Sequence, residues 1–203
     1  MLDAVSRLLE LVCGDEPAAW SRLGFAITDG ELVRLGPVTV RLTGAGGGLR
    51  GWTLDGDGGP AKLDGIATTW FPGAGDAAAA APVHPNGASE LDHVVVMTGS
   101  RDRTAAALTD AGGDERRRVG PPVVPVPMAF VRLGETIVEV AEAGGPARLW
   151  GLVAVVPGFD NLDGTLVGDP RGAVQPGRWI ATVRRAAGLG TELAFMSPRV
   201  RAR

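Results

Sequence analysis

The sequence predicts an α+β fold built from paired β-α-β-β-β modules, with a partial module ahead of them. Three observations lead to this prediction. Strand-like segments and one helix follow one another in that order after residue 89, the same order recurs about 58 residues later, and an upstream segment repeats one of the hairpins. A repeat of this length is a structural unit of the fold.

The first full module is expected over residues 89–145. It opens with the β-branched run 91–97, which Gly99 ends, and this pattern is typical of a buried strand. Ser100 is placed to cap a helix through residues 103–110. Three further strands are predicted over 116–119, 128–133 and 135–141, with Gly134 at the turn of a hairpin formed by the last two.

The second module is expected over residues 146–200. Segment 149–155 aligns with 91–97 at an offset of 58, and this offset places Asp160 and Leu166 in a second helix. Two later strands repeat those of the first module: 181–184 matches 129–132, and 193–196 matches 137–140. Their offsets of 52 and 56 place the length differences in loops.

A partial module is expected over residues 1–54. Residues 33–36 repeat 131–134, and the strand that follows them resembles the one after Gly134. Apolar residues at helical spacing predict an amphipathic helix over 2–12 and a short helix over 18–23, so that the first strand of the unit is missing and 49–54 supplies an extra strand. The Gly/Ala/Pro-rich segment 55–88 is predicted to be a linker with a short strand at 68–71.

Composition excludes several classes of protein. The chain is 45% hydrophobic and 21% charged, as ordinary globular domains are, and no apolar run approaches the ~18 residues of a membrane span. Its net charge of −3 argues against nucleic-acid binding. The first ten residues do not have the pattern of a signal peptide, and the single cysteine, Cys13, indicates a structural thiol in the reducing cytoplasm. One cysteine and two histidines exclude zinc sites that need three such ligands.

Three segments carry a resemblance to a known family: Leu91-Asp92-His93-Val94-Val95-Val96, Phe130-Val131-Arg132-Leu133-Gly134 and Ile137-Val138-Glu139-Val140. With their counterparts in the second module, they resemble the vicinal oxygen chelate superfamily, the glyoxalase/bleomycin-resistance/dioxygenase group. The resemblance implies that the two modules form an open barrel of mixed sheet around a metal or ligand. It also implies metal ligands on the first and fourth strands of each module, His, Gln or Glu on the first and Glu on the fourth.

Carried over to this chain, the family's ligand positions are only half filled. His93 and Glu139 match the first module, whereas Gly151 and Phe195 fall at the corresponding positions of the second. Two ligands are too few for a dedicated Ni²⁺, Zn²⁺, Mn²⁺ or Fe²⁺ site, so a divalent metal would need a further ligand from His84, Glu192 or a second chain.

Each candidate residue has two interpretations. His93, with Val95 on its own face and Asp92 opposite, is either a core histidine or a cavity residue, and Glu139 faces either solvent or the same cavity. Inside a cavity the two would form a general acid and base that needs no metal. Phe130, Trp179 and Phe195 either stack on a flat ligand or pack in the core. Arg132 and Arg184 either bind an anionic substrate or are solvated at a strand edge.

Two functional hypotheses follow. The first is a cytoplasmic protein that binds a small hydrophobic or aromatic molecule in the cavity between the modules, beside an incomplete metal site. The second is a metal-dependent lyase or dioxygenase that uses His93 and Glu139, completed by His84, Glu192 or a second chain. Both have a small-molecule partner and allow a homodimer, and neither involves nucleic acid or a membrane. A third option is a degenerate member with a structural or regulatory role.

Overall fold

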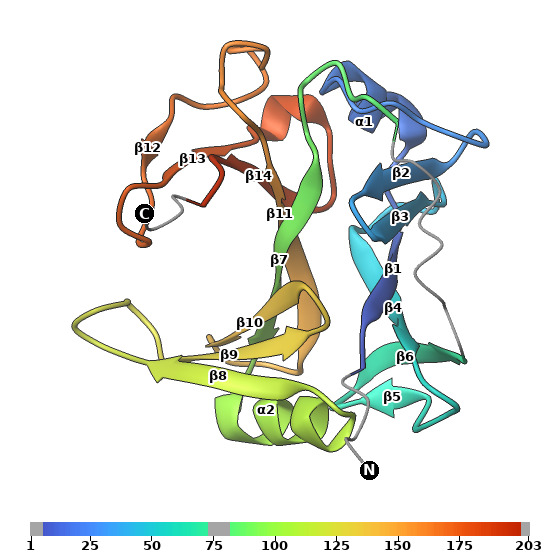
Figure 1. Cartoon of the computed structure of the whole chain (residues 1–203), viewed down its shortest axis with the longest axis vertical. Helices are drawn as coiled ribbons and strands as arrows, with labels where there is room; N and C mark the ends of the chain where they lie inside the picture. The colour runs from blue at the N-terminus through green and yellow to red at the C-terminus, as the bar shows by residue number, and fades with distance from the viewer. Residues whose placement is uncertain (1–5, 73–81, 200–203) are drawn as a thin grey trace.

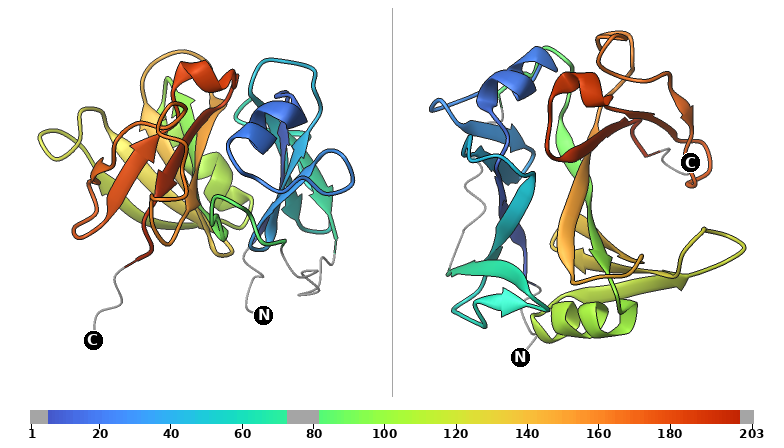
Figure 2. Two further views of the ribbon diagram at one scale, coloured as in Figure 1. Left: turned by 90° about the horizontal axis from the view of Figure 1, so that it is seen from above. Right: turned by 180° about the vertical axis from the view of Figure 1, so that it is seen from behind.

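A computed structural model describes residues 6–72 and 82–199 of the chain. It contains two mixed sheets of six and eight strands and few helices, which confirms the predicted α+β class (Figure 1). The eight-stranded sheet curves into an open half-barrel whose concave side faces away from the six-stranded sheet (Figures 1 and 2). No helix in the described ranges is long and apolar enough to cross a membrane.

The first full module has the predicted elements. They are β7 (Glu90–Thr98), α2 (Arg101–Asp110), β8 (Asp114–Val119), β9 (Met128–Leu133) and β10 (Thr136–Glu142). β10 pairs with β7 in parallel and with β9 as an antiparallel hairpin. The predicted cap is confirmed, because the Ser100 side chain accepts a hydrogen bond from the backbone N–H of Arg103.

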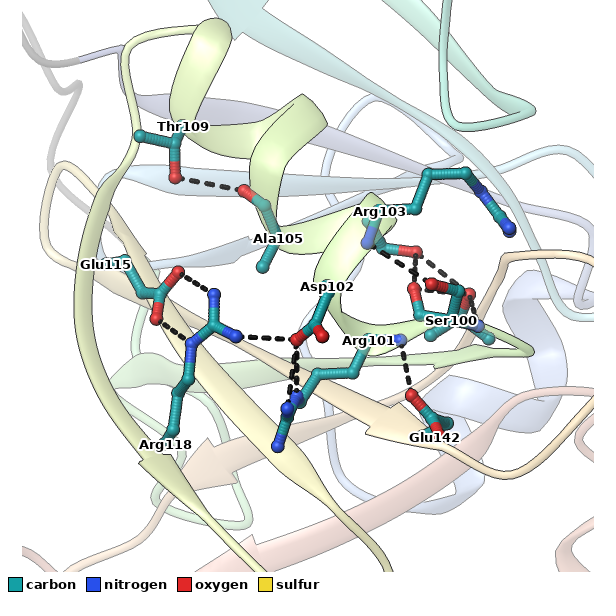
Figure 3. Close-up of polar contacts among 11 residues, drawn as sticks. Ser100, Arg101, Asp102, Arg103, Ala105, Thr109, Glu115, Arg118 and Glu142 are labelled. Carbon is teal, nitrogen blue, oxygen red and sulfur yellow. Dashed lines mark hydrogen bonds and ion pairs between the residues drawn. The ribbon is translucent and has the colours of Figure 1, made fainter.

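Figure 3 shows how α2 is attached to its neighbours. The Arg101 backbone N–H donates to Glu142 at the end of β10, at 2.9 Å. Arg118 of β8 donates to Glu115 on its own strand and to Asp102 in the first turn of the helix. Carboxylates in a first turn also complement the helix dipole, so these contacts set the start of α2 against the back of the sheet.

The second module has the predicted strands but no α-helix. Its elements are β11 (Arg148–Val155), β12 (Arg171–Gly172), β13 (Trp179–Thr182), the short 3-10 helix η1 (Arg185–Ala187) and β14 (Glu192–Met196). The helix predicted around Asp160 and Leu166 is wrong, since residues 156–170 form turns and irregular backbone. Pro157, Gly158 and Gly164 favour turns there over a helix.

β7 and β11 pair antiparallel at the centre of the sheet, and their register supports the 58-residue repeat. His93 lies opposite Val153, and Val95 lies opposite Gly151. Under the 58-residue offset, Gly151 is the equivalent of His93, and Val153 is the equivalent of Val95. Each residue of β7 therefore pairs with the equivalent of the other, as in a pair of strands related by a two-fold axis. The register shifts at Asp92 and at Trp150, which are also equivalent under this offset, and each shift marks a β-bulge.

The six-stranded sheet has the same plan in reduced form. Its elements are β1 (Leu8–Cys13), α1 (Pro17–Arg22), β2 (Leu32–Leu35), β3 (Val38–Leu42), β4 (Leu49–Asp55), β5 (Lys62–Leu63) and β6 (Ile66–Phe71). β1 pairs in parallel with β3 and antiparallel with β4, and β4 pairs in parallel with β6. The same relations hold among β7, β10, β11 and β14.

Two N-terminal expectations differ from this arrangement. The helix predicted over 2–12 is wrong for residues 8–12, because they belong to β1, the first strand that the sequence pattern left missing. Residues 2–5 lie outside the described residues. Pairing along both edges of β1 outweighs the helical spacing of its apolar residues. The segment expected as a linker contributes β5 and β6 to this sheet, whereas its alanine run, 77–81, is likewise outside the described residues.

The two sheets pack back to back around one continuous core. Leu11 and Trp52 of the six-stranded sheet belong to the same buried cluster as Val94 and Phe195 of the eight-stranded sheet. Val94 and His93 are neighbours on one strand and face opposite sides of it. The face that carries His93 is therefore directed away from the core and toward the concave side.

Candidate functional site

A cavity of about 230 Å³ lies on the concave face of the eight-stranded sheet. Strands of both modules form its walls, which are apolar except for one corner and the rim. It is lined by His93, Val95, Glu139, Trp150, Gly151, Leu152, Val153, Arg171, Ile180, Thr182, Glu192, Leu193 and Ala194. His93 and Glu139, predicted from the family resemblance, and Gly151 and Glu192 are thus brought to one place.

The bulge at Asp92 brings two consecutive side chains together. In a regular strand Asp92 would point away from His93, as the sequence analysis expected, and that expectation is wrong. The extra residue in β7 lets the Asp92 carboxylate contact the His93 Nδ1 at 2.8 Å. Since an ionised carboxylate only accepts, Nδ1 carries the proton and Nε2 is left as the acceptor of the neutral ring.

Asp92 is held by a second buried partner. Arg178, itself 4% exposed, donates to Asp92 Oδ1 at 2.8 Å and to the backbone carbonyl of Ser197. Burial alone would raise the pKa of Asp92, but the hydrogen bonds from His93 and Arg178 outweigh it and lower the pKa to about 2. Asp92 is therefore ionised at neutral pH, and each of its oxygens has its own donor.

Glu139 faces His93 across the corner of the cavity. Its Oε2 lies 3.7 Å from His93 Nε2, beyond hydrogen-bond distance. Burial raises the pKa of Glu139, and the proximity of Asp92 raises it further, while His93 opposes the shift. Phe130 lies opposite Glu139 on β9, but it is not among the residues that line the cavity.

The register shows what the second module places at the same corner. His93 pairs with Ile137, and Gly151 pairs with Glu192; Val95 pairs with Glu139, and Val153 pairs with Ala194. Gly151 is therefore the equivalent of His93, as the sequence analysis expected. The equivalent of Glu139 is Ala194 and not Phe195.

Phe195 differs from its expected position by one residue, which turns its side chain to the opposite face. Its ring is fully buried in the core between the sheets and stacks on Phe25, with 5.7 Å between ring centroids. It does not line the cavity, so core packing accounts for it.

The remaining candidates lie outside the cavity lining. His84 is buried, its Nδ1 accepts from the Ala26 backbone N–H at 2.9 Å, and its Nε2 is 2.7 Å from the carbonyl of Arg34. Both of its nitrogens are thus used in joining segments of the N-terminal half. Trp179 and Arg184 are exposed, and Arg132 contacts Asp114 at 3.6 Å.

The residues present do not fit a metal centre. Within residues 6–72 and 82–199, no group of three or more His, Cys, Asp or Glu side chains is placed to hold a metal ion. His93 and Glu139 provide two ligands, the equivalent positions carry Gly151 and Ala194, and His84 is engaged elsewhere. A dedicated transition-metal site takes three or four protein ligands.

The six-stranded sheet carries a salt bridge at the corresponding corner. Glu10 pairs with Thr39 as His93 pairs with Ile137, and Arg41 follows Thr39 by two residues as Glu139 follows Ile137. Arg41 Nη2 lies 3.0 Å from Glu10 Oε2, and the same guanidinium contacts Glu31. Cation and carboxylate thus pair with each other where the eight-stranded sheet holds His93 and Glu139 apart.

Sequence reasoning missed three residues of the site: Asp92, Trp150 and Arg178. The first two take part through bulges, which depend on strand pairing and leave no local sequence pattern. The repeat does place Asp92 and Trp150 at equivalent positions. Arg178 reaches Asp92 from a turn 86 residues further along the chain (178 − 92), and no local signal indicates that contact.

Similar solved structures are found for a little over half of the chain. Methylmalonyl-CoA epimerase from Mycobacterium tuberculosis is 12% identical, with 57% of this chain and 91% of that chain covered and a TM-score of 0.47. Hypothetical protein BH1468 from Bacillus halodurans is 15% identical, with coverages of 56% and 97% and a TM-score of 0.45. A Streptomyces coelicolor methylmalonyl-CoA epimerase in complex with 2-nitronate-propionyl-CoA is 13% identical, with coverages of 56% and 99% and a TM-score of 0.45.

These neighbours are members of the vicinal oxygen chelate superfamily, and the likeness is one of fold alone. The arrangement of strands in the eight-stranded sheet is consistent with the fold of this superfamily. No protein-family model matches the sequence, and a search of curated proteins finds no match.

Proposed function

We propose that this protein binds a small hydrophobic or aromatic molecule in the concave cavity, without a metal ion. The observation that carries the proposal is the composition of the cavity wall. Val95, Val153, Ile180 and Ala194 offer apolar surface, His93 and Glu139 form one polar corner, and Arg171, Thr182 and Glu192 complete the lining. Apolar walls with a few converging polar groups are typical of small-molecule sites.

Trp150 supports an aromatic or flat ligand. The bulge in β11 turns this side chain to the cavity, and 40% of it is exposed. A large exposed ring beside an apolar cavity offers a stacking surface that core packing does not require.

Two further predictions accompany the proposal: a cytoplasmic location and a homodimer.

Ligand binding tests the proposal. A library of small aromatic and aliphatic compounds is screened by the shift in melting temperature, and hits are titrated by calorimetry. We expect hits whose affinity falls about tenfold or more in Trp150→Ala, because the stacking surface is lost. Trp179→Ala is the matched control, since Trp179 is 52% exposed and lies outside the cavity lining. A library without hits, or equal losses in both variants, would contradict the proposal.

Metal titration separates this proposal from the metal-dependent lyase or dioxygenase. Because the described residues place just two candidate ligands together, His93 and Glu139, we expect no stoichiometric binding of Ni²⁺, Zn²⁺, Mn²⁺ or anaerobic Fe²⁺ at micromolar concentration. Stoichiometric metal that is lost in both His93→Ala and Glu139→Ala would favour the metal-dependent enzyme.

A second candidate function is metal-independent proton transfer. The observation that favours it is the 3.7 Å separation between an imidazole oriented by a carboxylate and a glutamate of raised pKa. Such a pair can remove one proton and supply another. The test incubates the protein with small carbonyl compounds in D₂O and follows deuterium incorporation by NMR. Incorporation that disappears in Glu139→Gln would support an enzyme, and no incorporation above the buffer rate would leave ligand binding alone.

A further inference from the structure

We infer that the cavity selects ligands that carry a hydroxyl group on an apolar ring, and that Asp92 sets this preference through the tautomer of His93. The inference rests on the proposed small-molecule function and deepens it by naming the ligand class. Asp92 is a positioning residue here, because it acts through His93 and does not line the cavity.

The first step is the free nitrogen of His93. The side chain is 7% exposed and lines the cavity, and its Nδ1 is occupied by Asp92. No hydrogen bond to Nε2 is formed within the described ranges of the chain, since Glu139 lies 3.7 Å away. Because Nε2 faces the open cavity, a ligand that supplies an O–H at this point can take the place of water on it and gain a hydrogen bond that an apolar substituent cannot make.

The second step is the direction of that hydrogen bond. Arg178 donates to Asp92 Oδ1 and cannot accept, so Oδ1 must be an acceptor. The other oxygen, Oδ2, faces His93 Nδ1 and receives its proton. In the neutral ring the buried arginine thereby leaves Nε2 as the acceptor, and Val95, Val153 and Ile180 offer an apolar ring a surface on the same wall.

The third step is what a substitution at Asp92 does. In Asp92→Asn, Arg178 should keep donating to the side-chain oxygen, which is now the amide oxygen of the asparagine. The amide NH₂ group then faces His93 Nδ1. Nδ1 must now accept, the proton moves to Nε2, and the cavity presents a donor in place of an acceptor. The ring stays where it was, so the variant changes the polarity of the corner without emptying it.

The experiment compares two probes of nearly equal size, 4-ethylphenol and 4-ethyltoluene, by calorimetry. We expect the wild-type protein to bind the phenol about tenfold more tightly, although the methyl group is the more hydrophobic substituent. In Asp92→Asn the preference should fall below about threefold, with the affinity for 4-ethyltoluene retained. Asp102→Asn, which changes an exposed carboxylate on α2, is the matched control and should keep the wild-type preference.

Equal binding of the two probes by the wild-type protein would overturn the inference and leave the proposed function standing. A preference that survives in Asp92→Asn would also overturn it, because the tautomer would then not be its cause. The wild-type comparison needs no variant, so the inference stays testable even if Asp92→Asn does not fold. Failure to bind either probe also counts against the inference, whereas only the wider library tests the proposed function.

Discussion

Gly151 is the position at which a single methyl group should test the packing of the eight-stranded sheet. A Cβ at this glycine would lie 2.5 Å from the backbone oxygen of Glu192 and 2.8 Å from its Cβ. Ordinary contacts begin at 3.4 Å, so β11 and β14 would have to separate by about 0.9 Å (3.4 − 2.5). The obstacle is backbone of a paired strand, which cannot rotate away as a side chain can.

We therefore expect Gly151→Ala to lower the free energy of unfolding by about 3 kcal/mol, at the upper end of the usual cost of overpacking. For a chain of this length, that loss corresponds to a fall of about 6–12 °C in melting temperature. Urea unfolding followed by circular dichroism measures it. Gly172→Ala is the matched control, because a Cβ at Gly172 of β12 would meet nothing within 4 Å. A difference between the two variants of less than about 0.5 kcal/mol would refute the packing argument.

Three further predictions concern buried polar groups. The pKa of Asp92 is lowered to about 2 from an ordinary 3.8, which stabilises the folded state by about 2 kcal/mol above pH 4. This stability is lost as the pH falls toward 2. In Asp92→Asn, the free energy of unfolding should therefore depend less on pH between pH 4 and pH 2. His84→Ala leaves the Ala26 N–H and the Arg34 carbonyl without a partner and should cost about 3 kcal/mol in urea unfolding, while ligand affinity in the cavity is unchanged; a loss of affinity would place His84 in the site. Burial raises the pKa of Cys13 to about 12, so iodoacetamide at about pH 8 should alkylate it only after unfolding, and rapid native labelling would contradict this.

The sequence predicted the full modules best because their strands are long and their signals agree. The β-branched run of β7, the Ser100 cap and the Gly134 hairpin each indicate one local structure, and the repeat adds independent support. β1 was missed for the opposite reason. Its six residues fit a helical as well as a strand pattern, and only the pairing with β3 and β4 decides between them.

The candidate site was predictable where it follows the repeat and not where it depends on irregular pairing. His93, Glu139 and Gly151 lie where the aligned modules place them. The bulge that joins Asp92 to His93 and the one-residue shift that sends Phe195 into the core arise from the register between strands. His84 was an available ligand in sequence terms, and its two backbone partners lie 50 and 58 residues away.

The continuous core between the sheets has a consequence for how the molecule unfolds. Leu11 and Trp52 pack in one cluster with Val94 and Phe195, so neither sheet can open without exposing the apolar back of the other. The two halves should therefore melt in one cooperative transition. A molecule bound on the concave side would then raise the melting temperature of β1 to β6 as much as that of the strands it touches.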